Sequence, residues 1–165
     1  MLKTKEKQLY KEFDAKEFIL GNNDGFLGII SSPRRTGKTV LITDFIEIMH
    51  KERKWDEVYL FSETAFAQGD AYRFVPFDNK FDTLDLGKLD EIFDKQSEAR
   101  QEHDRNPDKN KMTRVLIIAD DIINNKAVRG NNSFSRLATQ GRHFRIDVFA
   151  ITQHLKAFPP VFRKN

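Results

Sequence analysis

The sequence contains no cysteine and few histidines, which excludes several kinds of chemistry at the outset. Without cysteine there is no disulfide framework, thiol nucleophile, or cysteine-ligated zinc or iron–sulfur site. The histidines lack metal-ligand spacing, which argues against a zinc enzyme: they are His50, His103, His143 and His154. No apolar run approaches the roughly 18 residues of a membrane span. The first residues, Met1–Lys7, lack the apolar core of a secretory signal, so we do not expect secretion.

Acidic side chains are nearly missing from the last part of the chain. Residues 1–121 hold 20 lysines and arginines against 24 acids, whereas residues 122–165 hold 8 basic residues and the single acid Asp147. Such asymmetry is typical of a protein with one face that contacts a polyanion. A solvated basic tail has the same composition, so charge alone leaves both interpretations open.

Short apolar runs alternate with helical patterns along the chain. We expect strands over Phe26–Ser31, Val58–Phe61, Arg114–Ala119 and Ile146–Thr152, and a short edge strand at Tyr72–Phe77. Helices are expected over Met1–Lys16, Lys38–Lys51, Leu86–Arg105 and Asn131–Gln140. The uncharged run at Phe26–Ser31 is typical of a buried parallel strand. The alternation predicts one α/β domain over residues 1–165, with a mostly parallel sheet flanked by helices.

The segment Ser32–Thr39 fits the phosphate-binding loop pattern G-x-x-x-x-G-K-S/T, except that serine replaces the first glycine. Backbone N–H groups of such a loop form a nest for phosphates, and the following helix adds its positive dipole end. Lys38 supplies a charge for the β- and γ-phosphates, and the Thr39 hydroxyl can ligate Mg²⁺. We therefore predict binding of ATP and Mg²⁺ by Ser32, Pro33, Arg34, Arg35, Thr36, Gly37, Lys38, Thr39 and Val40.

Two acids follow the apolar strand Arg114–Ala119, and ligands in parallel sheets bind beyond the carboxyl ends of strands. A carboxylate delivered there beside a phosphate loop is a usual Mg²⁺ ligand, which makes Asp120 our candidate. Asp121 is the candidate general base for an attacking water, and Glu63 is a weaker rival. The alternative is that one aspartate only caps the following turn.

The last strand ends at Gln153, next to which we expect the aspartate strand. Its amide is a candidate sensor of the γ-phosphate or a group that orients water; the alternative is a simple strand-end cap. Arg142 and Arg163 are candidates for an arginine finger that reaches a neighbouring subunit's nucleotide. Surface arginines are more often solvated, so this role stays open for both.

These elements resemble the genome-packaging ATPases of large nucleocytoplasmic DNA viruses, the poxvirus type, within the FtsK–HerA group of P-loop motors. The resemblance rests on the phosphate loop, on the strands that end in Asp120-Asp121 and Thr152-Gln153, and on Gly141-Arg142-His143. The stretch Pro159–Asn165 is similar to the family's Pro-Pro-x-x-Arg-x-Asn signature. Matches run from about Phe26 to the end, with a poorly matched insert at Ala65–Met112.

The resemblance implies a RecA-like core, a ring-shaped homo-oligomer and ATP hydrolysis that drives double-stranded DNA into a preformed capsid. It implies docking at a viral capsid or portal vertex, and a location in the host cytoplasm at the assembly site or in the virion. The basic residues then contact DNA phosphates from the ring lumen: Arg129, Arg136, Arg145, Lys156 and Lys164. The chain stops at Asn165, where the family implies a further strand and helix.

Three alternatives remain at this point. The first is a cellular or plasmid DNA pump of the same superfamily. The second, a small-molecule kinase, needs an acceptor pocket and lid that the Ala65–Met112 segment does not suggest. The third is a nucleotide-gated module that binds DNA or capsid and hydrolyses poorly.

Overall fold

The computed structural model describes residues 24–67, 71–122, 132–155, 158, 160 and 162. Several predictions from the sequence fall outside these residues: the helix at Met1–Lys16, and the roles of Arg129, Lys156, Arg163 and Lys164. Within the described residues, no helix is long and apolar enough to cross a membrane.

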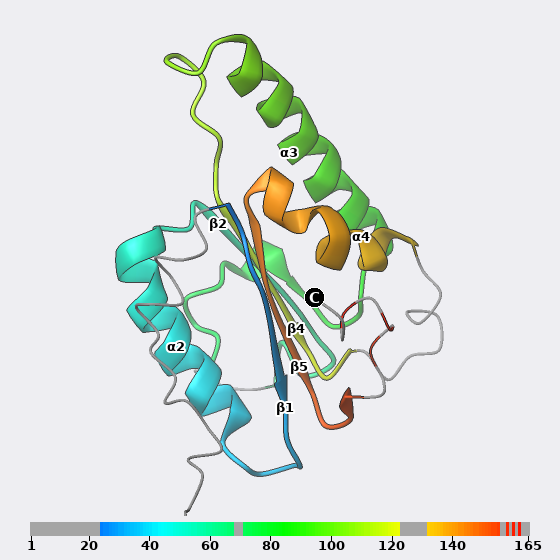
Figure 1. The fold of residues 1–165 in the computed structure, drawn as a ribbon. Helices are drawn as coiled ribbons and strands as arrows, with labels where there is room; N and C mark the ends of the chain where they lie inside the picture. Colours follow the sequence, from blue (N-terminus) through cyan, green and yellow to red (C-terminus); the bar gives the residue numbers. More distant parts are fainter. Residues whose placement is uncertain are drawn as a thin grey trace, which may run out of the picture.

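The described strands form one sheet in which every pairing is parallel. Its strands are β1 (Leu27–Ser31), β2 (Glu57–Ser62), β3 (Lys80–Phe81), β4 (Val115–Asp120) and β5 (Ile146–Thr152). Their spatial order is β1-β5-β4-β2-β3, so β5 lies between β1 and β4 (Figure 1). The register pairs Ser31 with Thr152 and Asp120 with Ile151, which brings the carboxyl ends of these strands to one edge. The α/β class with a parallel sheet is therefore confirmed.

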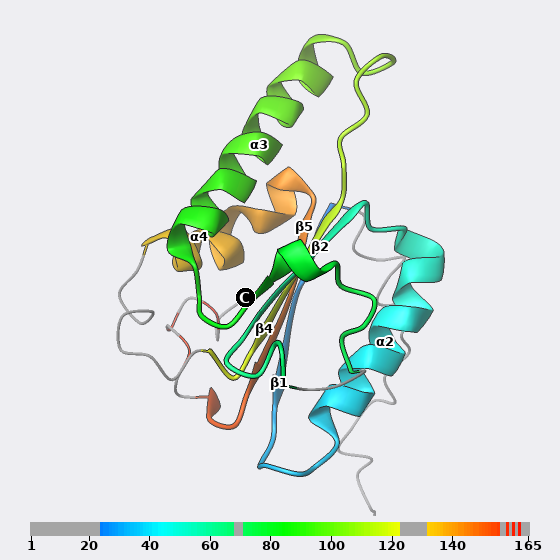
Figure 2. The same cartoon turned by 180° about the vertical axis from the view of Figure 1, so that it is seen from behind.

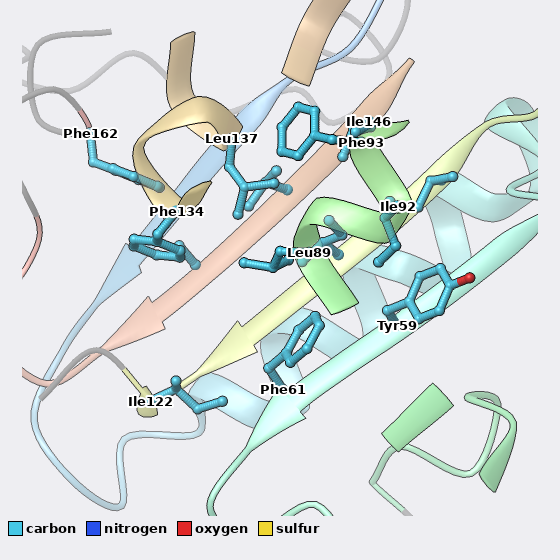
Figure 3. Packing of buried hydrophobic residues seen from close by; sticks show 14 of the residues in the cluster. Tyr59, Phe61, Leu89, Ile92, Phe93, Ile122, Phe134, Leu137, Ile146 and Phe162 are labelled. Atoms are coloured by element: carbon cyan, nitrogen blue, oxygen red, sulfur yellow. The ribbon is translucent and has the colours of Figure 1, made fainter. Parts of the chain in front are cut away.

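Helices cover both faces of the sheet. Helix α2 (Lys38–Arg53) lies on one face, and α3 (Leu86–Arg105) and α4 (Asn132–Gln140) lie on the other, as Figures 1 and 2 show from opposite sides. On the α3 and α4 side, apolar side chains of strands and helices interdigitate (Figure 3). The side chains at the centre of this cluster are buried, among them Phe61, Leu89, Phe93, Phe134 and Leu137.

Helix α2 packs through only part of the broad apolar face that its sequence indicates, which comprises Leu41, Ile42, Phe45, Ile46, Ile48 and Met49. Ile42, Ile46 and Met49 are buried against the sheet. Leu41 and Ile48, which the sequence groups with the apolar face, are 54% and 44% exposed. The helix itself is confirmed. It is capped by the next residue, Lys54, whose left-handed backbone (φ 52°) lets its N–H reach the carbonyl of His50.

The prediction that Phe26–Ser31 forms a buried strand is wrong about burial. Strand β1 is at the edge of the described sheet, and its residues Leu27 to Ile30 are only half-buried. An uncharged run predicts that both faces of a strand are covered by apolar side chains. It does not reveal whether the strand has a neighbouring strand along each of its edges. Gly28 is required here, because a side chain at this position would lie 2.8 Å from the Phe149 ring on β5.

The predicted edge strand at Tyr72–Phe77 is also wrong. Residues 71–74 form a turn in which the Val75 N–H donates to the Tyr72 carbonyl, and a 3₁₀ turn follows at Phe77–Asn79. Pro76 has no N–H and cannot join a ladder of hydrogen bonds. The edge strand is instead β3, which adds only Lys80 and Phe81 to β2.

Asp147, the single acid of the basic final part, is completely buried near the amino end of β5. Its carboxylate accepts hydrogen bonds from the Trp55 Nε1–H (2.7 Å), the Arg53 Nη1 (2.9 Å) and the Phe26 N–H (3.0 Å), and Arg114 Nη1 lies at 3.5 Å. Burial raises the pKa of Asp147 and lowers that of Arg53, and their mutual attraction opposes both shifts. We call these five residues the Asp147 cluster; it joins β1, α2, β4 and β5 at the amino edge of the sheet.

Candidate functional site

A cleft of about 510 Å³ opens at the carboxyl edge of the sheet. The loop after β1, the start of α2 and the ends of β2, β4 and β5 all contribute to it. Its lining holds most of the residues that the sequence singles out: Arg34, Arg35, Thr36, Gly37, Lys38, Thr39, Val40, Asp120, Asp121 and Gln153, together with Ser62, Glu63 and Thr64. These residues lie together because of the strand order, in which β5 places Gln153 between the loop after β1 and the two aspartates at the end of β4.

The loop has a backbone that alternates between ordinary and left-handed residues. Arg35 has φ 59° and Gly37 has φ 81°, and the Gly37 carbonyl accepts the first helical hydrogen bond, from the Leu41 N–H. A Cβ at Gly37 would meet nothing within 4 Å, so glycine is favoured here by its backbone angle and not by crowding. Ser32 is not among the described residues with positive φ, and serine therefore fits where the loop pattern has its first glycine.

Side chains hold the loop in a closed curl. The Thr36 hydroxyl donates to the Pro33 carbonyl at 2.8 Å and also contacts the Ser32 hydroxyl. The Lys38 ammonium donates to the carbonyls of Pro33 (2.7 Å) and Ser32 (3.0 Å). An ammonium has three N–H groups, so one more is left to donate to a ligand in the cleft.

A chain of hydrogen bonds crosses the cleft from the loop to the two strand ends. Arg34 Nε donates to Gln153 Oε1 at 2.9 Å, and Gln153 Nε2 donates to Asp121 Oδ2 at 2.7 Å. We call this the Arg34–Gln153–Asp121 relay. The other carboxylate oxygen of Asp121, Oδ1, is buried and has no hydrogen-bond partner within the described part of the chain. A buried carboxylate oxygen without a hydrogen-bond partner is costly to the folded state.

Asp120 is held differently from its neighbour. Its Oδ2 accepts a hydrogen bond of 2.9 Å from the Tyr72 hydroxyl, and the Thr39 side chain lies close enough to the same hydroxyl to act on its pKa. Tyr72 is 1% exposed and Asp120 is 4% exposed. Burial, and next the charge of Asp120, raise the pKa of Tyr72 well above its usual range, so the phenol keeps its proton. One hydroxyl therefore lies beside both predicted Mg²⁺ ligands and is hydrogen-bonded to Asp120.

The structure places the remaining predicted residues as follows. Glu63 and Val40 line the cleft and are exposed. Arg142 lies in the 3₁₀ turn Gly141–Phe144 before β5, at the amino edge of the sheet and away from the cleft of its own chain. It closely approaches Gly25, where an added Cβ would lie 2.8 Å from the Arg142 Cα. Arg136 stacks on the Phe93 ring (4.4 Å), and Arg145 donates to the Met112 carbonyl.

Two features of the site were not predicted from the sequence. Tyr72 comes from a segment interpreted as an edge strand, and nothing in its neighbours signals that its hydroxyl donates to Asp120. Arg34 occupies a variable position of the loop pattern, so its bond to Gln153 across 119 residues has no local signature. Both contacts depend on tertiary structure.

The chain matches no known family model, no curated protein and no solved structure. The site therefore has to be interpreted from its own geometry. Among the described residues, no group of three or more histidine, aspartate or glutamate side chains gathers to hold a metal. The cleft instead combines a cationic, N–H-rich loop on one side with two carboxylates and an amide on the other.

Proposed function

We propose that the chain is a P-loop ATPase with a RecA-like strand arrangement. The observation that carries the proposal is the position of β5 between β1 and β4, which opens the loop, both aspartates and Gln153 onto one cleft. The curled loop with left-handed Arg35 and Gly37 at a helix N-terminus supports phosphate binding. The remaining N–H of Lys38 supplies a point charge for the β- and γ-phosphates.

The residues of the cleft fit a Mg²⁺ ion. Thr39 and Asp120 offer the hard oxygen ligands that Mg²⁺ prefers, and both lie beside the Tyr72 hydroxyl. Mg²⁺ usually takes one or two protein oxygens and completes its shell with phosphates and water. When bound, it would supply positive charge that neutralises the phosphates.

We assign hydrolysis to the Arg34–Gln153–Asp121 relay. A water on the open side of the γ-phosphate attacks phosphorus, its proton passes to Asp121, and the bond to the β-phosphate oxygen breaks to give ADP and phosphate. The Asp121 carboxylate is the acceptor, and Gln153 holds it by donating to its Oδ2. Gln153 fixes the carboxylate, and Arg34 fixes the amide so that its NH₂ group faces Asp121.

Asp121→Asn is expected to bind ATP with unchanged affinity and to hydrolyse it about 10²- to 10⁴-fold more slowly, because a general base is removed. Asparagine has the same size and tolerates the left-handed backbone of this position (φ 54°), so the fold is retained. Single-turnover hydrolysis and calorimetric binding measure the two effects. Glu63→Gln is the comparison variant: if it loses turnover while Asp121→Asn keeps it, the base is Glu63.

We further propose that hydrolysis drives double-stranded DNA into a viral capsid, in a ring of identical subunits. This finer proposal is supported by the resemblance of the Arg-His, Gln and Pro-Pro motifs to packaging ATPases and by the basic residues 122–165. Arg142 lies at the edge of the sheet opposite the cleft, so a finger role for it requires a neighbouring subunit. The alternative proposal, a cellular or plasmid DNA pump, has the same reaction and differs from the viral motor only in its partner.

A nucleotide-gated binding module with weak hydrolysis is the second candidate. It is favoured by one observation, the Tyr72 phenol between the two predicted metal ligands. Steady-state ATPase assays with and without double-stranded DNA distinguish the candidates. The motor predicts Mg²⁺-dependent turnover that DNA stimulates and that falls with rising salt. Binding of ATP without turnover, at any DNA concentration, contradicts the motor and supports the module.

A further inference from the structure

The Tyr72 hydroxyl occupies the space between the two side chains that are best suited to a metal. It donates to Asp120 and lies beside Thr39, so the carboxylate that is best placed to hold a metal already has this phenol as a partner. A hydrogen bond to a charged carboxylate is stronger than one between neutral groups. A metal that binds through these oxygens competes directly with this phenol.

We propose that Tyr72 closes the metal position and is displaced when a Mg²⁺–nucleotide complex binds. This inference rests on the proposed nucleotide site and adds to it a residue that sets the metal dependence of binding. Tyr72 is a positioning residue in this role, because it controls access to Asp120 and Thr39 and takes no part in the reaction.

Displacement of Tyr72 must involve its backbone. The ring is 1% exposed and packs in the apolar cluster between α2 and the sheet, so it cannot turn out of the cleft while residues 71–75 stay fixed. The same segment faces a second cavity of about 710 Å³, where Ala71, Arg73 and Phe74 lie across from Trp55. Within this segment, Tyr72 thus closes the metal position, while Ala71, Arg73 and Phe74 line a separate cavity.

Trp55 makes this movement measurable, because it is the single tryptophan of the chain. It lies two residues beyond α2, a helix of 16 residues that spans about 24 Å from the loop. A nucleotide in the cleft is too distant to contact the indole. A difference in Trp55 emission between metal-bound and metal-free nucleotide therefore reports a change in the surroundings of the indole, which include Ala71, Arg73 and Phe74.

The experiment compares nucleotide binding with Mg²⁺ and with chelator, by calorimetry on ADP and a slowly hydrolysed ATP analogue. In Tyr72→Phe the phenol no longer holds Asp120, so the preference for Mg²⁺–nucleotide over metal-free nucleotide should rise about tenfold. Tyr59→Phe is the matched control. Tyr59 is also buried and donates to a carboxylate, Glu57, but on the other face of the sheet, and its removal should leave the preference unchanged.

The second measurement uses the unaltered chain. Trp55 emission should change with Mg²⁺–nucleotide and stay constant with metal-free nucleotide. An unchanged or reduced Mg²⁺ preference in Tyr72→Phe overturns the inference, as does constant emission in the presence of the bound metal complex, while the nucleotide site itself stands. Absence of nucleotide binding under both conditions contradicts the proposed function and this inference with it.

Discussion

Lys38→Ala is expected to weaken nucleotide binding ten- to a hundredfold and to abolish measurable turnover. The variant removes the positive charge that faces the phosphates, a charged hydrogen bond of about 1.5–3 kcal/mol. It also removes the two bonds that curl the loop, to the carbonyls of Ser32 and Pro33. Calorimetry and a phosphate-release assay measure these losses. Thermal unfolding should show that the domain is still folded, since the core lies elsewhere.

The control is Lys51→Ala, on the same helix. Lys51 is exposed and lines the second cavity, so its removal should change neither binding nor turnover. Hydrolysis by Lys38→Ala at the original rate would rule out the assigned loop. If the ring proposal holds, mixing Lys38→Ala subunits with Arg142→Ala subunits should restore part of the turnover, because each supplies the group that the other lacks. No recovery at any ratio would assign Arg142 a structural role.

Asp147→Asn should lower the free energy of unfolding by about 3–5 kcal/mol, the usual result when one partner of a buried ion pair is removed. The side chain of Arg53 is 4% exposed and would keep its charge beside a neutral amide. The amide also has one acceptor oxygen in place of two, so the donors of Trp55 and Phe26 cannot both be satisfied as before. Urea unfolding followed by Trp55 fluorescence measures the change.

Asp104→Asn is the matched control for this effect. Asp104 also pairs with an arginine, Arg100, but the pair is on the exposed surface of α3, and its loss should cost no more than about 0.5 kcal/mol. Equal stability of the two variants would mean that the Asp147 cluster contributes nothing beyond an ordinary surface pair.

Local sequence patterns were sufficient for most elements of the fold. The run Ile146–Thr152 coincides with β5, and Val115–Asp120 is one residue from its prediction, because uncharged β-branched runs favour buried strands. Leu86 to Arg105 forms α3, whose start is fixed by the Asp85 carboxylate, which caps the N–H of Lys88. Such patterns do not specify neighbours in space. The edge position of β1 and the inward turn of Tyr72 therefore could not be predicted.

The same distinction applies to the site. The phosphate-loop pattern and the polar residues at strand ends identified Lys38, Asp120, Asp121 and Gln153, and the structure brings all four to one cleft. The hydrogen-bond partners of these residues could not be identified from local patterns. Arg34 and Tyr72 reach Gln153 and Asp120 from segments far away in the sequence, and only the arrangement of the strands and the placement of residues 71–75 determine these contacts.

Helix α2 connects the loop of the cleft to the opposite edge of the sheet. Its first residues complete the loop, and Arg53 in its last turn is bound to the Asp147 cluster. The helix is thus anchored to β5 at one end while its other end directs its N–H groups into the cleft. If a phosphate binds there as proposed, it meets donors whose positions are already set, so little ordering entropy is lost on binding. The buried ion pair at the far edge of the sheet would in this way contribute to affinity through preorganisation, although it never touches the nucleotide.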